Sequence, residues 1–500
     1  MVAKPPMQCN LEVAQQGLTD TVRWISEAAI NGTAAHVVER QLLRRMLSLG
    51  SLLFEGFIRE VGPGDAGPTM TLKDGLIVNR LPEQHSRRLV TVFGEFSIPR
   101  YVYPTRQGQK IELAPTDQRL QLPGSAVSYL LQEWDQMLGI EHAFGRVGHT
   151  LRTIAGLKQP VDTLERGNRQ MAEAAPAFRA AQPAPDPEAE GSILVGTVDN
   201  KGVPMVRPVA SVPAGTHRKK GEKANKKQMA CIACVHTVNP HVRTPEEMIS
   251  ILYRDPGRQP EDTPQAIQKR YWSELTREVA GRTVRGQEEV FKHMASDIAL
   301  RRKPGQILLH LCDGQNSLET DRWEYLPTDE NTVEILDLMH VLPRMWEAAH
   351  LFNDEGSDEA KAFVRERLPY VLNGCTADVI AEFRRLGSEH GLRGANAKRL
   401  KKLCAFLEKN LHRMKYDEYL KAGYPIATGV IEGACRHVIK DRMERAGMRW
   451  KVPGAHAMLQ LRAISANGDW EAFLEFRIQY ENARLYPHKE IEAVPWPIAA

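Results

Sequence analysis

The sequence lacks several features that mark common classes of protein. Its seven cysteines are few, odd in number and scattered over 500 residues, which indicates reduced thiols rather than a disulfide framework. No apolar run approaches the about 18 residues that a membrane-spanning helix needs. Residues 1–10 contain no apolar core of a signal peptide. We therefore expect a cytoplasmic protein with no membrane partner.

Three common catalytic motifs are also missing. No pair of histidines forms an HExxH motif, which argues against a zinc hydrolase. No serine or cysteine stands in a nucleophile elbow, and no Gly-rich lysine loop of the Walker type is present for ATP. Cys231 and Cys234 form a lone CxxC pair without the further ligands of a zinc site, so both are predicted to be core residues.

The composition is that of an ordinary globular protein. Hydrophobic residues make up 42% and charged residues 26%, and the length predicts several domains. The formal net charge of +4 is too small to indicate a nucleic-acid partner by itself. The distribution of the basic residues is more informative, because they cluster.

Residues 1–120 are predicted to contain a helix followed by a small β module. Apolar residues recur at the helical period over 36–60, and Gly62–Pro63 ends that helix. Three strands are expected at 75–79, 88–93 and 96–103, with Gly94–Glu95 as a tight turn.

Residues 121–175 are predicted to form three short helices, near 125–138, 141–154 and 161–174. Their glycine-bearing turns and basic residues fit a helix-turn-helix DNA-binding region. A plain helical bundle with a charged surface fits the same pattern equally well. The Ala/Pro-rich stretch 176–191 then predicts a linker.

Beyond the linker, strands and helices alternate, which predicts an α/β fold. We assign residues 192–352 to the first part of this core, 353–420 to an all-helical insertion, and 421–500 to the second part of the core. Strands are expected at 193–198, 228–238, 306–312 and 332–338, and helices at 265–302, 340–352, 455–464 and 470–485.

Three carboxylates stand where an α/β protein places functional groups. Asp199 and Asp313 each follow directly on a predicted strand, and strand ends are where ligands collect in an open sheet. Glu432 stands near the start of a predicted helix. An all-oxygen site of this kind suits Mg²⁺ or Mn²⁺, and two ions serve phosphodiester chemistry. Each residue alone fits a helix cap or turn former; the three together favour catalysis.

Two basic segments accompany these carboxylates and are predicted to contact DNA phosphates. A loop carries Arg218, Lys219, Lys220, Lys226 and Lys227, and the helix after Glu432 carries Arg436, Lys440, Arg442, Arg445 and Arg449. Helical spacing places Glu432, Arg436 and Lys440 on one face. A solvated charged surface is the alternative, and it fits the loop better than the helix. Trp450 either stacks on an unpaired base or belongs to the core, and we favour the core.

The order Asp199, Asp313, Glu432, on strand, strand and helix, resembles that of DDE transposases with an RNase H-like fold. Residues 424–450 resemble the C-terminal signature of the Kra-type insertion-sequence transposases, and Asp313–Gly314 resembles their second-aspartate motif. Residues 337–340 resemble the Asp/Cys-x-x-His motif of the related Mutator-like transposases. The resemblance covers roughly residues 35–485, and the long interval before Glu432 fits relatives with a helical insertion.

The resemblance implies an RNase H-like catalytic core. In it, Asp199, Asp313 and Glu432 bind two Mg²⁺ or Mn²⁺ ions and catalyse DNA cleavage and strand transfer. His340 would orient the scissile phosphate, although a helix-start histidine bonded to Asp337 fits as well. The implied partners are the element's terminal inverted repeats, target DNA and a second copy of the chain, in the nucleoid.

Two further expectations concern a zinc site and the alternative functions. Relatives carry a zinc ribbon near residues 103–108, but the paired cysteines are missing here, so no zinc is expected. An RNase H-like nuclease without strand transfer and a non-catalytic DNA-binding regulator remain alternative functions.

Overall fold

The computed structural model describes residues 10–72, 74–106, 108, 110–206, 227–255, 264–427, 429–445 and 447–487. The chain divides into two compact units, one made of Met1–Phe178 with Glu471–Ala500 and the other of Arg179–Trp470. In the described ranges, no helix has both the length and the apolar character needed to cross a membrane.

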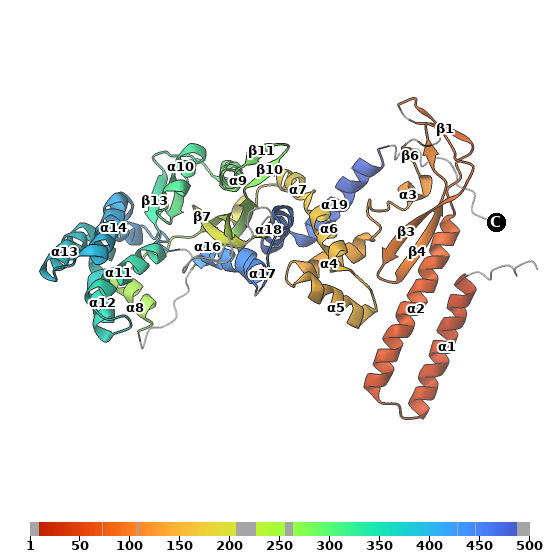
Figure 1. Ribbon diagram of the computed structural model, residues 1–500, viewed down its shortest axis with the longest axis horizontal. Coiled ribbons are helices and arrows are strands. Elements are labelled where there is room, and N and C mark those ends of the chain that lie inside the picture. Colours follow the sequence, from red (N-terminus) through yellow and green to blue (C-terminus); the bar gives the residue numbers. More distant parts are fainter. Residues whose placement is uncertain are drawn as a thin grey trace, which may run out of the picture. The chain divides into compact units, whose positions relative to one another are not determined.

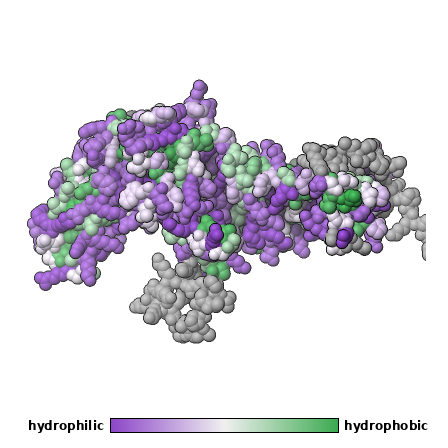
Figure 2. All heavy atoms as spheres, turned by 90° about the horizontal axis from the view of Figure 1, so that it is seen from above, coloured by the Kyte–Doolittle hydropathy of each residue, from purple (hydrophilic) through white to green (hydrophobic). Residues whose placement is uncertain are grey.

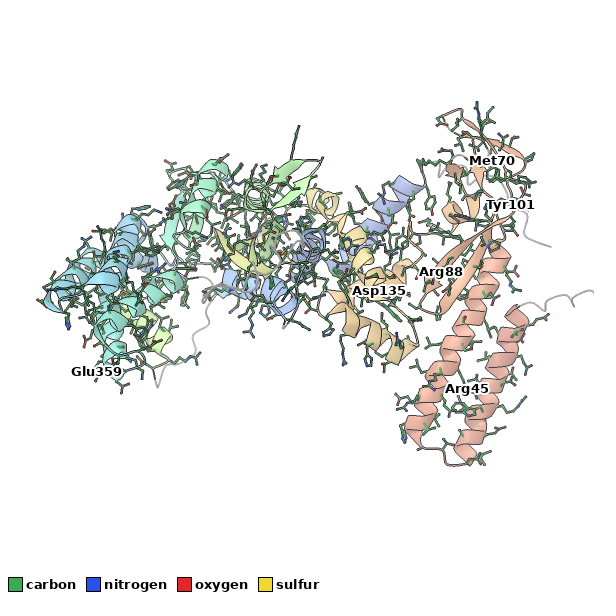
Figure 3. All side chains as sticks on the ribbon, in the orientation of Figure 1. Arg45, Met70, Arg88, Tyr101, Asp135 and Glu359 are labelled. Carbon is green, nitrogen blue, oxygen red and sulfur yellow. The ribbon has the colours of Figure 1, made fainter. Side chains whose placement is uncertain are left out.

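The first unit begins with a helical hairpin (Figure 1) of α1 (Asn10–Ile30) and α2 (Ala35–Val61). The predicted helix at 36–60 is thereby confirmed, whereas α1 was not predicted. Three residues of α1 spaced at heptad intervals, Ala14, Thr21 and Ala28, are buried. Arg45 of α2 lies between the two helices (Figure 3), with its guanidinium 4.6 Å from the ring centre of Trp24.

The small β module consists of three antiparallel strand pairs rather than three strands. These are β1 (Thr69–Thr71) with β2 (Ile77–Asn79), β3 (His85–Thr91) with β4 (Gly94–Arg100), and β5 (Tyr103–Pro104) with β6 (Ile111–Leu113). The predicted turn at Gly94–Glu95 is wrong. Because Thr91 pairs with Gly94, the turn residues are Val92 and Phe93.

Helices complete the first unit. They are α3 (Pro115–Arg119), α4 (Tyr129–Gly139), α5 (Phe144–Ala155), α6 (Val161–Ala172) and most of α19 (Trp470–Leu485). The three helices predicted within 121–175 are confirmed as helices. The buried amide of Gln136 joins α4 to α6, donating to Leu164 O at 3.1 Å and accepting from Asn168 at 2.9 Å. The predicted linker is partly helical, because α7 (Ala175–Ala181) overlaps its start and η1 (Pro187–Ala189) lies within it.

The second unit is built on a five-stranded mixed sheet in the order β13-β12-β7-β8-β9. Its strands are β7 (Ile193–Pro204), β8 (Lys227–Val238), β9 (Ile267–Leu275), β12 (Leu308–Cys312) and β13 (Thr332–Leu336). The first three run antiparallel in sequence order, and β12 and β13 run parallel to β7. The α/β class is therefore confirmed.

The sheet also corrects one predicted element. Residues 265–302 were expected to be helical, but the first half forms β9 and the small hairpin of β10 (Arg277–Val279) and β11 (Arg282–Val284). Only α9 (Gly286–Arg301) is helical there. The predicted strands at 228–238, 306–312 and 332–338 are confirmed.

Helices cover both faces of the sheet. α9 and α10 (Asn316–Tyr325) lie on one face (Figure 1). On that face Leu194, Val235 and Met294 belong to one buried cluster. α8 (Pro245–Tyr253) and α11 (Leu338–Phe352) lie on the other, where Ile193 and Val195 begin a larger cluster. The two clusters alternate along β7, as the two-residue period of a strand requires.

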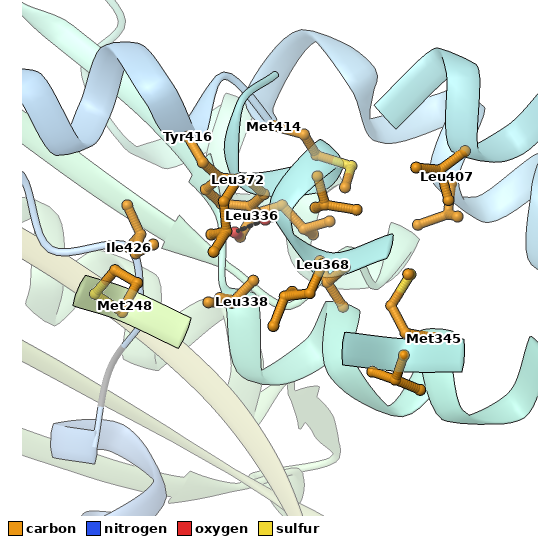
Figure 4. Close-up of a cluster of buried hydrophobic side chains, with 14 of the residues drawn as sticks. Met248, Leu336, Leu338, Met345, Leu368, Leu372, Leu407, Met414, Tyr416 and Ile426 are labelled. Atoms are coloured by element: carbon orange, nitrogen blue, oxygen red, sulfur yellow. Dashed lines mark hydrogen bonds between the residues drawn. The ribbon is translucent and has the colours of Figure 1, made fainter. Parts of the chain in front are cut away.

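The insertion at 353–420 is helical, as predicted. It contains α12 (Asp358–Leu372), α13 (Thr376–Glu389), α14 (Gly394–Asn410), η3 (Leu411–Arg413) and α15 (Tyr416–Lys421). Its core is continuous with that of the sheet (Figure 4), because Leu368 and Leu407 share one cluster with Leu336 and Leu338. The Tyr416 hydroxyl donates to Leu336 O at 2.7 Å. On the face shown in Figure 2, the surface is mostly hydrophilic, with hydrophobic residues in separate small groups.

The last part of the second unit carries the candidate site. It contains α16 (Gly429–Ala434), the π-helix η4 (Cys435–Lys440), α17 (Asp441–Met443) and α18 (Val452–Ala466). α16 and η4 pack on β7 and β8, on the face opposite α9 (Figure 1).

Candidate active site

Asp199 lies on β7, and Asp313 directly follows β12, the parallel strand next to β7. β12 pairs with β7 so that His310 lies beside Gly196 and Leu311 beside Thr197. Continuing this register by two residues places Asp313 beside Asp199. Both positions share the strand parity of Val195 and Leu309, so both side chains belong to the face that α16 covers.

The two aspartates differ in their strand positions. Asp313 follows directly on β12, as predicted. Asp199 does not end its strand, because β7 continues to Pro204 and pairs with β8 over its whole length. Gly314 has a φ of 79°, and a Cβ there would meet the Phe406 ring at 2.8 Å, so the Asp313–Gly314 turn requires glycine.

The carboxyl of Asp313 is electrostatically unfavourable when it is charged. Burial raises its pKa, and the negative charges of Asp199 and Glu319 raise it further. A hydrogen bond from the Gln315 amide at 2.7 Å and the nearby His340 act in the opposite direction without reversing the shift. A divalent cation beside the two aspartates would offset this repulsion.

Cys435 connects Asp199 to the helix that carries Glu432. Its thiol donates a hydrogen bond to Oδ2 of Asp199 at 3.2 Å. Burial raises the pKa of the Cys435 thiol, and the charges of Asp199 and Glu432 raise it further, so the sulfur keeps the proton that it donates. Glu432 itself is exposed, one helical turn before Cys435.

The segment that carries Glu432 is tied to the core at both ends. At its start, the Leu338 amide at the beginning of α11 donates to Ile426 O at 2.9 Å. At its end, the Trp450 amide donates to Pro204 O at 3.0 Å, and the Val206 amide donates to Trp450 O at 2.8 Å. These bonds hold the segment across the sheet, although Glu432 is remote in sequence from Asp199 and Asp313.

The helix after Glu432 is not a regular α-helix. Residues 435–440 form a π-helix, in which the Asp441 amide bonds to Arg436 O, five residues earlier. Arg462 of α18 supports this widened turn, because its buried guanidinium donates to Val438 O at 2.8 Å and also to His437 O. The π-helix widens the turn on which the four-residue spacing was predicted, and Glu432, Arg436 and Lys440 are all exposed.

The predicted phosphate contacts divide into accessible and buried side chains. Arg436, Lys440, Arg445 and Arg449 are exposed. Arg442 is only 1% exposed and lies 4.9 Å from the ring centre of Trp450, which corrects its assignment to DNA contact.

The structure tests the predicted DNA contact of Trp450, whereas most of the predicted contacts of the basic loop stay untested. Trp450 is 8% exposed and its indole donates to Met443 O at 3.1 Å, so it is a core residue, as we favoured, and its role in base stacking is withdrawn. The predicted contacts Arg218, Lys219, Lys220 and Lys226 lie outside the described residues. Lys227, the last basic residue of that loop, forms an ion pair with Glu444.

His340 lies in the first turn of α11, close enough to Asp313 to influence its pKa. The side chain of Asp337 caps this helix by accepting from the Met339 amide at 2.8 Å. His340 Nδ1 is buried and has no hydrogen-bond partner among the described residues. The His340–Asp337 side-chain bond that was the alternative is therefore not formed through Nδ1.

The donor set fits a hard divalent cation, since Asp199, Asp313 and Glu432 offer only oxygen. In the described ranges, no three His, Cys, Asp or Glu side chains are gathered closely enough to hold one metal ion. The structure thus brings Asp199 and Asp313 together and places Glu432 on the adjacent helix.

Cys231 and Cys234 are buried core residues, as predicted.

A pocket of about 770 Å³ lies beside the helix of Glu432. Gly433 and His437 line it on one side and Lys269 and Tyr271 of β9 on another, with Leu311 of β12 among its other lining residues. Lys269 and His437 are exposed. The pocket therefore carries the basic side chains of Lys269 and His437 next to the candidate site.

Comparison with known proteins gives no family assignment, since neither a family model nor a curated protein matches the chain.

Sequence reasoning missed two residues of the site. Cys435 carried one signal, its position three residues after Glu432, which places both on neighbouring turns of a helix. Arg462 carried none, because its role depends on carbonyl groups that only the π-helix leaves available to it.

Proposed function

We propose that this protein is a DNA transposase of the DDE type, which cleaves DNA at the ends of an insertion sequence and joins those ends to target DNA. The observation that carries the proposal is the parallel register of β12 on β7, which brings Asp313, directly after β12, close to Asp199, with the helix of Glu432 bonded to Asp199 through Cys435. The resemblance to the Kra-type transposases was drawn from sequence motifs, and this spatial arrangement of the carboxylates supports it.

The sheet supports an RNase H-like core. That fold has three antiparallel strands followed by two strands that run parallel to the first, and β7, β8, β9, β12 and β13 follow this pattern. The helical insertion that separates β13 from Glu432 agrees with relatives that carry such an insertion.

In this proposal Asp199, Asp313 and Glu432 hold two Mg²⁺ or Mn²⁺ ions. Such ions supply an activated nucleophile and stabilise the leaving oxygen in phosphodiester chemistry. Cys435 fixes the Asp199 carboxylate through its hydrogen bond, and His340 lies near Asp313, where it would help to orient the scissile phosphate. Both residues would orient groups rather than bind metal.

DNA would be held largely by charge. The exposed side chains of Arg436, Lys440, Arg445 and Arg449 follow Glu432 along the chain and supply sequence-independent phosphate contacts. In the first unit, α4, α5 and α6 would recognise the terminal inverted repeats as a helix-turn-helix. A dimer would bring the two ends together.

A strand-transfer assay tests this function against its rivals. Purified protein would be incubated with Mg²⁺ and labelled DNA that carries both flanks of the coding sequence, together with a target plasmid. A transposase gives joined products, a nuclease gives cleaved ends without joining, and a regulator binds DNA without cutting it. Cleavage without joining, or binding alone, would overturn the proposal.

A further inference from the structure

The α1–α2 hairpin exposes large apolar side chains in a regular pattern. On α2, Leu43, Met46, Leu53 and Phe57 follow the three- and four-residue spacing of one helical face, and 37–49% of each is exposed. On α1, Leu18, Val22 and Ile25 repeat the same spacing and are 37–58% exposed. These seven residues are called the apolar face below.

The two halves of the apolar face lie on the same side of the hairpin. The buried line of α1 runs through Ala14, Thr21 and Ala28, and Arg45 marks the side of α2 that faces α1. Successive residues of a helix are rotated by about 100°. On each helix, this rotation places the exposed apolar residues to the same rotational side of the residues that face the other helix. Because the helices are antiparallel, this displacement brings both sets to one flank.

Among the described residues of the first unit, those outside the hairpin leave this flank exposed. α2 packs on the β module through Phe54 and Ile58, which share a cluster with Phe96. Phe93 of the β3–β4 turn lies over Gly50, where a Cβ would meet its ring at 2.6 Å, and so borders the apolar face. Phe93 is itself 39% exposed.

The exposed apolar area is large for the surface of a monomer. Seven side chains of this size and exposure leave on the order of 600 Å² of apolar surface, at the upper end for the largest patch of a monomer. With its polar margin the apolar face approaches the about 800 Å² that each partner contributes to a standard interface. A helix layer that is apolar on one side is stable when a second layer covers that side.

We propose that the apolar face is covered by the same face of a second copy of this chain, so that two hairpins form an intermolecular four-helix bundle. A face two helices wide is matched in length, width and chemistry by itself, as a two-fold interface requires. The proposal rests on α1 and α2 alone and does not depend on the proposed transposase function. It goes beyond that function by assigning the surface through which two chains associate.

The test is the oligomeric state of the full-length protein, measured by analytical ultracentrifugation over the micromolar range without DNA. The wild type is expected to be a dimer. The double substitution L43E and F57E is expected to raise the dimer dissociation constant about 100-fold or more, since it places charges in the centre of the interface. S48E is the matched control, because Ser48 is exposed on the opposite side of α2.

Folding of the variants is checked by circular dichroism and thermal melting. If the double variant does not fold, V22E on α1 tests the same face, since Val22 is 58% exposed. A monomeric wild type would overturn the proposal. The apolar face would then be covered by another protein or by the chain's own termini. A dimer that survives both L43E with F57E and V22E would also overturn it.

Discussion

The thiol of Cys435 donates a hydrogen bond to Oδ2 of Asp199 at 3.2 Å, across a large interval of sequence. This bond joins the helix of Glu432 to the strand of Asp199, and the parallel register joins that strand to Asp313. Backbone bonds at Ile426 and Trp450 fix the same helix at both of its ends. The site is thus assembled by long-range contacts, and each contact leads to a measurable expectation.

The first prediction separates exposed from buried cations on the basic segment. Lys440→Ala and Arg436→Ala are expected to weaken DNA binding and to lower the dependence of log affinity on log salt by about one each, with the melting temperature unchanged. Arg442→Ala is expected to lower the melting temperature instead, because its guanidinium is buried against Trp450. Fluorescence anisotropy at several salt concentrations and thermal melts measure both effects. A stable Arg442→Ala protein with the same altered salt dependence would contradict the burial of Arg442.

The second prediction concerns Cys435 as a positioning residue. Cys435→Ala removes the hydrogen bond to Asp199 and is expected to lower the strand-transfer rate about tenfold and to raise the Mg²⁺ concentration needed for half-maximal rate. Cys435→Ser keeps a donor and should stay within a few-fold of wild type. Cys404→Ala is the control, since Cys404 is buried in the hydrophobic cluster of the insertion and should change stability without changing the Mg²⁺ requirement. Equal activity of the Ala and Ser variants would exclude the positioning role.

The third prediction tests the support of the π-helix. Arg462→Ala leaves the carbonyls of His437 and Val438 without the guanidinium and is expected to destabilise the protein by about 2–4 kcal/mol. Arg449→Ala, at an exposed position, should stay within about 0.5 kcal/mol. Urea denaturation followed by circular dichroism gives both values. A neutral Arg462→Ala would show that η4 does not need this partner.

The fourth prediction concerns the pH dependence of stability. The pKa of Asp313 is raised above the ordinary value of 3.8, so the folded state holds this proton more tightly than the unfolded state does. Its contribution to stability is therefore lost as pH rises through the raised pKa. Asp313→Asn should melt a few degrees above wild type at neutral pH, and this difference should shrink toward pH 4.

The same melting temperatures are also measured with Mg²⁺ present. A cation that binds beside Asp199 and Asp313 stabilises the folded wild type, so Mg²⁺ should raise its melting temperature and leave that of Asp313→Asn unchanged. Glu330→Gln, at an exposed position of the same unit, is the control. If Asp313→Asn and Glu330→Gln melt alike at every pH, burial of a charged Asp313 is not a source of instability.

Much of the fold could be read from local patterns. β12 and β13 are short and largely apolar, and most of β8 is apolar. The insertion repeats leucines at the helical period, so these elements follow from the sequence alone. β9 was missed because it is an edge strand with charged residues. Its Glu274 is buried only through tertiary partners, including His456 at 2.7 Å.

The site could be predicted only in part, because some of its features depend on tertiary contacts. Asp313 and Glu432 could be placed on their elements from local sequence, but the true length of β7 depends on its pairing with β8. The burial of Arg442 depends on Trp450, which a sequence pattern cannot bring into contact with it. The π-helix depends on Arg462, a residue of another helix.

The most direct test of the central claim is strand transfer by three single variants, Asp199→Asn, Asp313→Asn and Glu432→Gln, with Mg²⁺ and the end-bearing DNA described above. Glu444→Gln, on the same segment as Glu432, is the matched control. If the three carboxylates form one metal site, each of the three variants should lose strand transfer by at least about 1,000-fold while still binding DNA, and the control should keep its activity. Full activity in any one of the three variants would contradict the account.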